Sequence, residues 1–357
     1  MKLNNRDKLV TWFCENYWQW VQAMKATNHF PEHRTDHPFH GEGSVWTHTM
    51  MVMTNIDCDE NIEEEIINEN KQILLTVALL HDIGKPLSRQ VKEQGEKFSF
   101  EGHEGISYYK AIDILKSMEK VDDFYTNDRI FLILKLISVH GTHILFEENS
   151  RDWYLSNRFR KADKRGAVRN VDENIFAQYP KKKVSSRKHT LEDKELIICV
   201  GLPGSGKTTY IEENLKDYFV ISRDKFMIEY YDSFTTNNSE LVTGNTIYDF
   251  INHEDNIESF NKLFDNFINV VSKREDKVVI DMTMLTFGKR RSMLNKFSKH
   301  NANCVVFISG EKEINRVNRE RETFDAGLTD SRLLTLKKKF IFPIEEEGFN
   351  DVRLRFR

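Results

Sequence analysis

A short glycine-rich run near the middle of the chain limits what its second half can fold into. Residues 201–209 read Gly-Leu-Pro-Gly-Ser-Gly-Lys-Thr-Thr, which fits the pattern GxxxxGK[ST] without a gap. An apolar run of strand length, 195–200, precedes it, and 210–215 has helical character. A loop between a strand and a helix at this spacing points backbone N–H groups and the helix N-terminus at a phosphate. The sequence therefore predicts a nucleotide phosphate site.

Individual loop residues have predicted roles. Lys207 reaches the outer phosphates, and Thr208 offers its hydroxyl to Mg²⁺. The remaining phosphate contacts are expected from Gly201, Gly204, Ser205, Gly206 and Thr209. ATP or another nucleoside triphosphate with Mg²⁺ is therefore the expected ligand. What the motif leaves open is the acceptor of the phosphate.

Composition sets the outer bounds. A chain of 357 residues is long for one core, so two domains are expected, and the net charge of −4 argues against a strongly basic nucleic-acid coat. The four cysteines stand far apart without CxxC spacing, which predicts reduced thiols rather than disulfides or a cysteine zinc site. No apolar run approaches the roughly 20 residues that span a bilayer, and the polar N-terminus lacks a signal-peptide core. We expect a cytoplasmic protein without a membrane partner.

The first half has helical patterning. An aromatic and apolar stripe over 7–24 predicts a packing helix, and 46–53 and 73–85 read as two further helices. His81 and Asp82 stand near the end of the last of these. A carboxylate there must be paired or bound to a metal, because burying it alone is unfavourable.

Further metal-ligand residues follow in order along the chain. The complete set is His48, His81, Asp82, His103, His140 and Asp163. This ordered set, with the HDxGK extension ending at Lys85, resembles the HD phosphohydrolase superfamily over about residues 1–175. The resemblance implies an all-α domain that binds one or two divalent transition metals through imidazole and carboxylate ligands.

The same resemblance implies individual roles. Asp82 would bridge two metals, with His48, His81 and Asp163 completing one, and His103 with His140 serving the second. Lys85 would contact the substrate phosphate. Glu104 is a candidate acid or base, or equally a surface carboxylate. The other histidines, read as polar surface or structural residues, are His29, His33, His37, His40 and His143, of which only His143 lies near enough to a ligand to replace it.

A polar and basic stretch at 176–193 reads as a linker, and 194–357 as a second domain. Apolar strands at 218–221, 277–281 and 302–308 alternate with helical stretches, which predicts an α/β fold with a parallel sheet. Asp224 follows the second strand, where a carboxylate can accept the proton of an attacking hydroxyl.

Arginines near the C-terminus are candidates for a lid over the phosphates. The segment 315–321 reads as a helix that carries Arg319 and Arg321. Guanidinium groups stabilise charge spread over the transferring phosphoryl oxygens. A salt-bridged surface helix is an equally good interpretation, because glutamates surround these arginines.

The second half resembles the P-loop polynucleotide 5'-hydroxyl kinases. The matching pieces are GLPGSGKTT, SRD with Asp224 at the general-base position, the DxT segment at Asp281, and the lid arginines. Two positions depart from that pattern, since only Lys225 follows the base where an arginine is common, and Met284 replaces a usual asparagine. The Asn- and Thr-rich stretch 230–258 is a candidate lid or acceptor-binding insertion.

The order of the two halves resembles the HD-Pnk type of bifunctional end-healing enzyme. That resemblance implies phosphorylation of 5'-OH ends of RNA or DNA and removal of 2',3'-cyclic, 2'- or 3'-phosphate ends, with a separate ligase sealing the break. One alternative is a small-molecule, nucleoside-like kinase fused to a nucleotide phosphohydrolase. Another is a nucleotide-sensing regulatory protein, against which the intact ligand set and Asp224 argue.

Overall fold

The chain divides into two compact units by its internal contacts. A computed structural model describes residues 2–31, 41–59, 67–92, 97–142, 146–167, 193–234, 244–322 and 328–356. Unit 1 comprises Met1–Val184 with Lys337–Phe342, and unit 2 comprises Ser185–Leu336 with Pro343–Arg357. The linker expected at 176–193 lies almost wholly outside the described residues, so the sequence-based domain boundaries stay a prediction.

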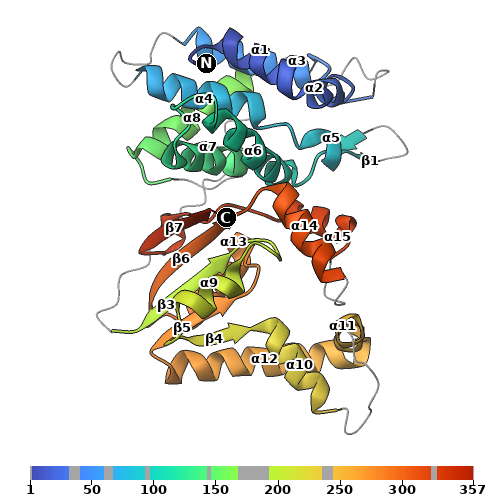
Figure 1. Ribbon diagram of the computed structural model, residues 1–357, viewed down its shortest axis with the longest axis vertical. Helices are drawn as coiled ribbons and strands as arrows, with labels where there is room; N and C mark the ends of the chain where they lie inside the picture. The colour runs from blue at the N-terminus through green and yellow to red at the C-terminus, as the bar shows by residue number, and fades with distance from the viewer. Residues whose placement is uncertain are drawn as a thin grey trace, which may run out of the picture. The chain divides into compact units, whose positions relative to one another are not determined.

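Unit 1 is a helical bundle with one small hairpin (Figure 1). Its helices are α1 (Arg6–Asn16), α2 (Trp18–Lys25), α3 (Val45–Asp57), α4 (Ile67–Leu80), α5 (Lys85–Ser88), α6 (His103–Glu119), α7 (Asn127–Val139) and α8 (Arg151–Gly166). The hairpin pairs β1 (Gln90–Lys92) with β2 (Lys97–Ser99) in antiparallel register. Among all described residues of the chain, no helix is both long and apolar enough to cross a membrane.

Side-chain caps define where several of these helices begin. The side chains of Asn5, Ser44, Thr126 and Ser150 each accept a hydrogen bond from a backbone N–H in the first turn. The single helix expected over 7–24 is instead two helices, α1 and α2. Tyr17 leaves the helical conformation between them, and its ring packs against preceding aromatic side chains of α1.

The core of unit 1 includes a segment from far along the chain. Phe340 stacks on Tyr108 of α6 with ring centroids 4.3 Å apart, and the backbone N–H of Phe342 donates to Ser138 Oγ at 2.9 Å. A Cβ atom at Gly105 would clash with the carbonyl oxygen of Lys337. The segment 337–342, here called the C-terminal strap, is therefore packed against α6 and α7 of unit 1.

Unit 2 is built on a fully parallel sheet of five strands (Figure 1), which confirms the predicted α/β class. The strands, in chain order, are β3 (Glu195–Val200), β4 (Phe219–Ser222), β5 (Lys277–Asp281), β6 (Asn301–Ile308) and β7 (Asp351–Phe356). Their spatial order is β4-β5-β3-β6-β7. The carboxyl ends of β3, β4 and β5 therefore meet at one edge of the sheet.

Helices join these strands. They are α9 (Lys207–Asn214), α10 (Arg223–Asp232), α11 (Gly244–Asn252), α12 (Glu254–Arg274), α13 (Phe287–Lys296), α14 (Glu311–Glu322), α15 (Asp330–Lys338) and the 3₁₀ turn η3 (Glu345–Glu347). Ile197 and Cys199 of β3 pack with Ile211 of α9 in a buried apolar cluster. The stretch 230–258, expected to be an insertion, is largely helical where it is described, and 235–243 lies outside the described residues.

Candidate functional sites

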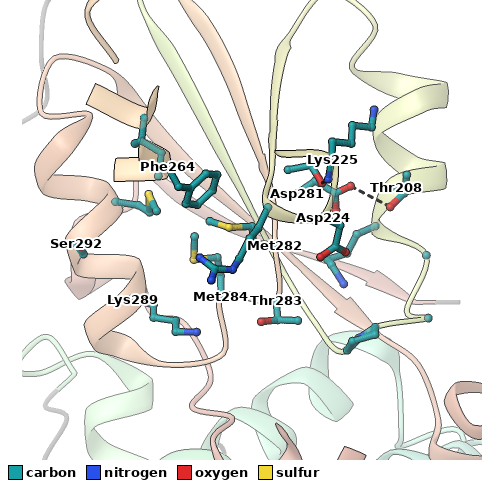
Figure 2. A pocket seen from close by; sticks show the side chains of 18 of the residues that line it. Thr208, Asp224, Lys225, Phe264, Asp281, Met282, Thr283, Met284, Lys289 and Ser292 are labelled. Carbon is teal, nitrogen blue, oxygen red and sulfur yellow. Dashed lines mark hydrogen bonds between the residues drawn. The ribbon is translucent and has the colours of Figure 1, made fainter. Parts of the chain in front are cut away.

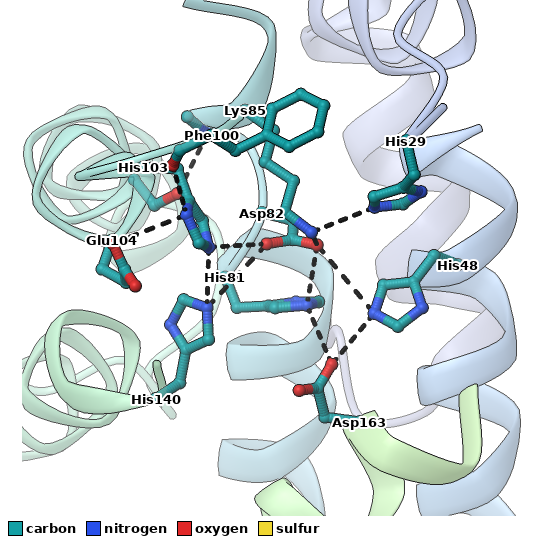
Figure 3. Close-up of polar contacts among 12 residues, drawn as sticks. His29, His48, His81, Asp82, Lys85, Phe100, His103, Glu104, His140 and Asp163 are labelled. Atoms are coloured by element: carbon teal, nitrogen blue, oxygen red, sulfur yellow. Dashed lines mark hydrogen bonds and ion pairs between the residues drawn. The ribbon is translucent and has the colours of Figure 1, made fainter. Parts of the chain in front are cut away.

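Five helices of unit 1 bring the predicted metal ligands together (Figure 3). His48 lies on α3, His103 begins α6, and Asp163 lies on α8. His81 and Asp82 follow the last residue of α4, and His140 is the C-cap of α7. Ligand atoms of His48, His81 and Asp82 lie within 4.8 Å of one another, and so do those of Asp82, His103 and His140.

Asp82 stands between the two groups. Its Oδ2 lies 3.2 Å from His81 Nε2 and 3.9 Å from His48 Nε2. Its Oδ1 lies 3.2 Å from His103 Nε2 and 3.8 Å from His140 Nε2. One carboxylate thus faces two pairs of imidazoles with its two oxygens, an arrangement that suits a bridging ligand.

Asp163 belongs to the first pair. Its Oδ1 lies 2.9 Å from His48 Nε2 and 3.5 Å from His81 Nε2. The division of ligands that the sequence suggested corresponds to this grouping, although the role of each residue at a metal stays a prediction.

Hydrogen bonds behind the imidazoles aim their Nε2 atoms at the centre of the cluster. Nδ1 of His81, His103 and His140 lies 2.8, 2.8 and 2.6 Å from the backbone carbonyl oxygen three residues earlier. A carbonyl oxygen can only accept, so each Nδ1 carries the hydrogen and each Nε2 is left as the ligand atom. His48 Nδ1 lies 3.0 Å from Glu42 Oε1. Such outer contacts are typical of metal-ligating histidines.

The donor set fits divalent cations. His103 Nε2 and His140 Nε2 face each other at 3.1 Å, where two lone pairs repel unless a proton or a cation lies between them. Among the described residues, Asp82 Oδ1 and His81 Nε2 are buried without a hydrogen bond of acceptable geometry, whereas Asp82 Oδ2 pairs with Lys85 Nζ at 2.7 Å. A cation held by these atoms relieves both situations.

The imidazoles and carboxylates of the cluster shift one another's pKa values. Burial lowers the pKa of His81, but the carboxylates of Asp82 and Asp163 outweigh it and raise this pKa to about 10. Burial raises the pKa of Asp82, yet the neighbouring His81 and Lys85 hold it well below its usual value. Burial and the neighbouring imidazoles, with His103 foremost, lower the pKa of His140 to about 4.

Several other predicted residues lie around this cluster. Lys85 is buried, and its Nζ lies 2.7 Å from Asp82 Oδ2. Glu104 Oε2 lies 3.5 Å from His103 Nδ1, so this carboxylate is beside the site. Sequence reasoning missed Glu42, because no spacing pattern distinguishes one glutamate before a helix. It also assigned no role to His29, which proves to be buried. The remaining histidines, His33, His37, His40 and His143, lie outside the described residues.

The phosphate loop of unit 2 takes the geometry that its glycines permit. Gly204 and Gly206 have φ angles of 83° and 93°, in the left-handed region that glycine adopts without strain. Helix α9 starts at Lys207, whose Nζ donates to the carbonyl oxygens of Gly201 and Leu202 at 3.1 and 2.8 Å. An incoming nucleotide would exchange these carbonyls for phosphate oxygens.

The residues predicted to bind Mg²⁺ and the residue predicted to act as the base line one cavity of ≈ 800 Å³. Thr208 Oγ1 donates to Asp281 Oδ2 at 2.9 Å, so a hydroxyl and a carboxylate meet where Mg²⁺ is expected. Asp224 and Lys225 line the same cavity from the start of α10. Gly204, Gly206 and Thr209 also line it, whereas Gly201 and Ser205 are not among the residues that line it.

The side of the cavity opposite the loop is largely apolar. Phe264, Ile268, Met284 and Met293 line it and are nearly fully buried. In Figure 2, Phe264 and Met284 lie across the cavity from Thr208 and Asp224. Lysine side chains from α13 complete this side, which leaves room for an acceptor molecule beside Asp224.

A buried ion pair holds the loop that follows Asp281, the last residue of β5. Met284 has φ 43°, a strained value for a side chain with a Cβ. Arg290 Nη1 donates to the Met284 carbonyl oxygen at 3.0 Å, and its Nε and Nη2 bind Glu347 at 2.7 and 2.6 Å. Sequence reasoning missed this pair, because Glu347 is far away in the chain.

Of the two predicted lid arginines, only Arg319 has a described side chain, and it does not line the cavity. Arg319 is exposed on α14, where Val317 is the residue that lines the cavity, and the side chain of Arg321 lies outside the described residues. Asn318 anchors the helix instead, since its Nδ2 donates to the carbonyl oxygen of Pro203 at 3.1 Å. Neighbouring Arg316 pairs with glutamates on the same helix. The lid role of Arg319 and Arg321 stays a prediction.

Two family models and one solved structure are similar to parts of this chain. One crystal structure, of a candidate kinase from Chloroflexus aurantiacus J-10-fl, is 12% identical with a TM-score of 0.34, covering 46% of this chain and 86% of that one. Similarity at that level carries no argument about function. The HD domain family model matches residues 45–158, and the AAA domain family model matches residues 196–343. The chain thus carries an HD domain followed by a P-loop, kinase-like AAA domain.

Proposed function

We propose that the protein heals broken nucleic-acid ends with two activities. The kinase half phosphorylates 5'-OH ends with a nucleoside triphosphate, and the HD half removes 2',3'-cyclic, 2'- or 3'-phosphates. The observation that carries the proposal is that one chain holds both a phosphate-loop cavity with a facing carboxylate and a two-part metal-ligand cluster. Strand breaks with a cyclic phosphate on one side and a 5'-OH on the other need both reactions.

The kinase step follows from the residues around the cavity. Lys207 and the loop N–H groups would bind the outer phosphates, and Thr208 with Asp281, which share a hydrogen bond, would hold Mg²⁺. The oxygen of the 5'-OH attacks the γ-phosphorus, and Asp224 accepts the proton of that hydroxyl. The bond from the γ-phosphorus to the leaving nucleoside diphosphate breaks. The apolar side around Phe264 and Met284 receives the acceptor.

The hydrolytic step uses the buried cluster of unit 1. The two imidazole pairs and the carboxylates would hold divalent ions, which would supply Lewis-acid activation of water and positive charge for the phosphoryl oxygens. Asp82 and Asp163 would contribute carboxylate ligands, and the Nδ1 hydrogen bonds keep the Nε2 atoms of the imidazoles directed into the cluster. Lys85 binds a phosphate oxygen with its ammonium group.

The proposal includes substrates and a partner activity. RNA and DNA ends share the reacting groups, so both are substrates to be compared. A separate ligase would join the healed ends, since the two reactions leave a 5'-phosphate and a 3'-OH.

The test supplies γ-labelled ATP with two acceptors of equal concentration. One is a 5'-OH RNA oligonucleotide that ends in a 2',3'-cyclic phosphate, and the other is a free nucleoside. Label transfer to the oligonucleotide and loss of its cyclic phosphate are expected. Transfer to the nucleoside alone would contradict the proposal and favour a small-molecule kinase. A DNA oligonucleotide in parallel measures the preference between the two polymers.

A further inference from the structure

His29 is a fully enclosed histidine outside the predicted ligand set. It lies in the connection between α2 and α3 and is only 2% exposed. An isolated bridge between Asn28 and Ser44 fixes its backbone, and its N–H donates to the Gly43 carbonyl oxygen at 3.0 Å. The imidazole of His29 is therefore buried and fixed in place beside the metal-ligand cluster.

Two contacts define the hydrogen positions on its ring. Nδ1 lies 3.1 Å from the Gly43 carbonyl oxygen, which can only accept, so Nδ1 carries the hydrogen. Nε2 lies 3.0 Å from Lys85 Nζ. The ammonium group has only hydrogens to offer, so Nε2 accepts from it as a neutral imidazole nitrogen.

Lys85 is consequently held from two sides. Its Nζ lies between His29 Nε2 and Asp82 Oδ2, the latter at 2.7 Å (Figure 3). The His29 ring packs edge-on against Phe100, whose ring also lies 5.6 Å from Lys85 Nζ. A carboxylate in place of His29 would neutralise the lysine. A neutral acceptor orients the ammonium group without adding a second negative charge to that of Asp82, so a phosphate can still interact with it.

We infer that His29 is a positioning residue that holds Lys85 in reach of the substrate phosphate at the metal cluster. The inference rests on the proposed phosphohydrolase function for the identity of the substrate. The contact between His29 and Lys85 would affect the binding of a phosphate group whichever molecule carries it. His29 is not among the residues whose ligand atoms form the two metal groups of the described chain. Its replacement should therefore change phosphate binding and not metal content.

Three substitutions in the full chain separate the two contacts of the ring. Gln places its amide oxygen near the position of Nε2 and can accept from Lys85. Asn places its amide near Nδ1 and keeps only the contact to Gly43, and Ala keeps neither. We expect His29→Asn and His29→Ala to weaken binding of inorganic phosphate to the Mn²⁺-loaded protein by about tenfold. His29→Gln should stay within about threefold of the wild type.

The measurement is calorimetric binding of inorganic phosphate in a Lys207→Ala background, so that the phosphate loop does not contribute. Mn²⁺ stoichiometry is measured alongside, and melting temperature reports folding. In a Lys85→Ala background, His29→Ala should have no further effect, because the lysine through which it acts is gone.

Several outcomes would overturn the inference. These are unchanged phosphate affinity in His29→Ala, an undiminished effect in the Lys85→Ala background, no effect of Lys85→Ala itself, or loss of bound Mn²⁺, which would make His29 a ligand. If the wild type does not hydrolyse strand-end phosphates yet phosphate binding follows the expected pattern, the proposed substrate fails and the inference about His29 holds.

Discussion

At the scale of single residues, the HD cluster depends on the direction in which each imidazole points. Helix ends make this possible, because a histidine at or just after a helix terminus can donate Nδ1–H to the carbonyl three residues back. His81 and His140 do so at the ends of α4 and α7. The Nε2 atoms of both rings then point toward the carboxylate of Asp82. The HD sequence pair therefore encodes orientation as well as ligand identity.

Protons and metal ions should compete at His81. In the metal-free protein its pKa is raised to about 10, because two carboxylates outweigh burial. At neutral pH a metal must therefore displace a proton, and its affinity should rise as pH increases toward 10. Below that pKa we expect about one proton released from His81 per first metal bound. Titrating Mn²⁺ calorimetrically in two buffers of different ionisation enthalpy measures this release. A buffer-independent heat would contradict it, and Asp82→Ala should abolish the binding.

At the scale of elements, the C-terminal strap completes unit 1. Phe340 is 2% exposed and contacts the rings of Tyr108 and Tyr109 on α6. The strap comes close to α6 at Gly105, which is two residues after His103, the first residue of that helix. The strap thus supports the helix that carries a predicted metal ligand.

Removal of the Phe340 ring should destabilise unit 1. We expect Phe340→Ala to lower its free energy of unfolding by about 3–5 kcal/mol, because the lost contacts leave a cavity. Differential scanning calorimetry of the full chain, in which each unit can give its own transition, measures the change. Phe234→Ala is the matched control, since Phe234 is 58% exposed and should change stability by less than about 1 kcal/mol. Equal effects of the two substitutions would show that the strap is not part of the core.

At the scale of the whole molecule, the sequence could predict what local patterns encode. The sequence predicts the two family-like motifs and the fold class, because each has a contiguous signature. The same holds for the strands β3, β4, β5 and β6. The strap, the pair of Arg290 with Glu347 and the contact of His29 with Lys85 were not predicted. These join residues that are 56 or more positions apart and carry no spacing pattern. Strand β7 was also missed, although its alternating residues carry a weak period of two.

Two chemically separate sites predict separable activities. Lys207 and Asp224 belong to the cavity of unit 2, and Asp82 to the cluster of unit 1. We expect Lys207→Ala and Asp224→Ala to reduce phosphorylation of 5'-OH ends at least about 100-fold, because phosphate charge or the base is lost. Both should leave removal of 2',3'-cyclic phosphates unchanged.

Asp82→Ala should do the reverse, because the carboxylate facing both imidazole pairs is gone while the phosphate loop is untouched. Parallel assays of both activities on one doubly blocked oligonucleotide measure the separation, and Glu320→Ala on the exposed face of α14 is the control for nonspecific effects. Loss of both activities in Asp82→Ala, with an unchanged melting temperature, would mean that the two reactions share a site. Retention of cyclic-phosphate hydrolysis in that variant would show that the metal ligands are assigned wrongly.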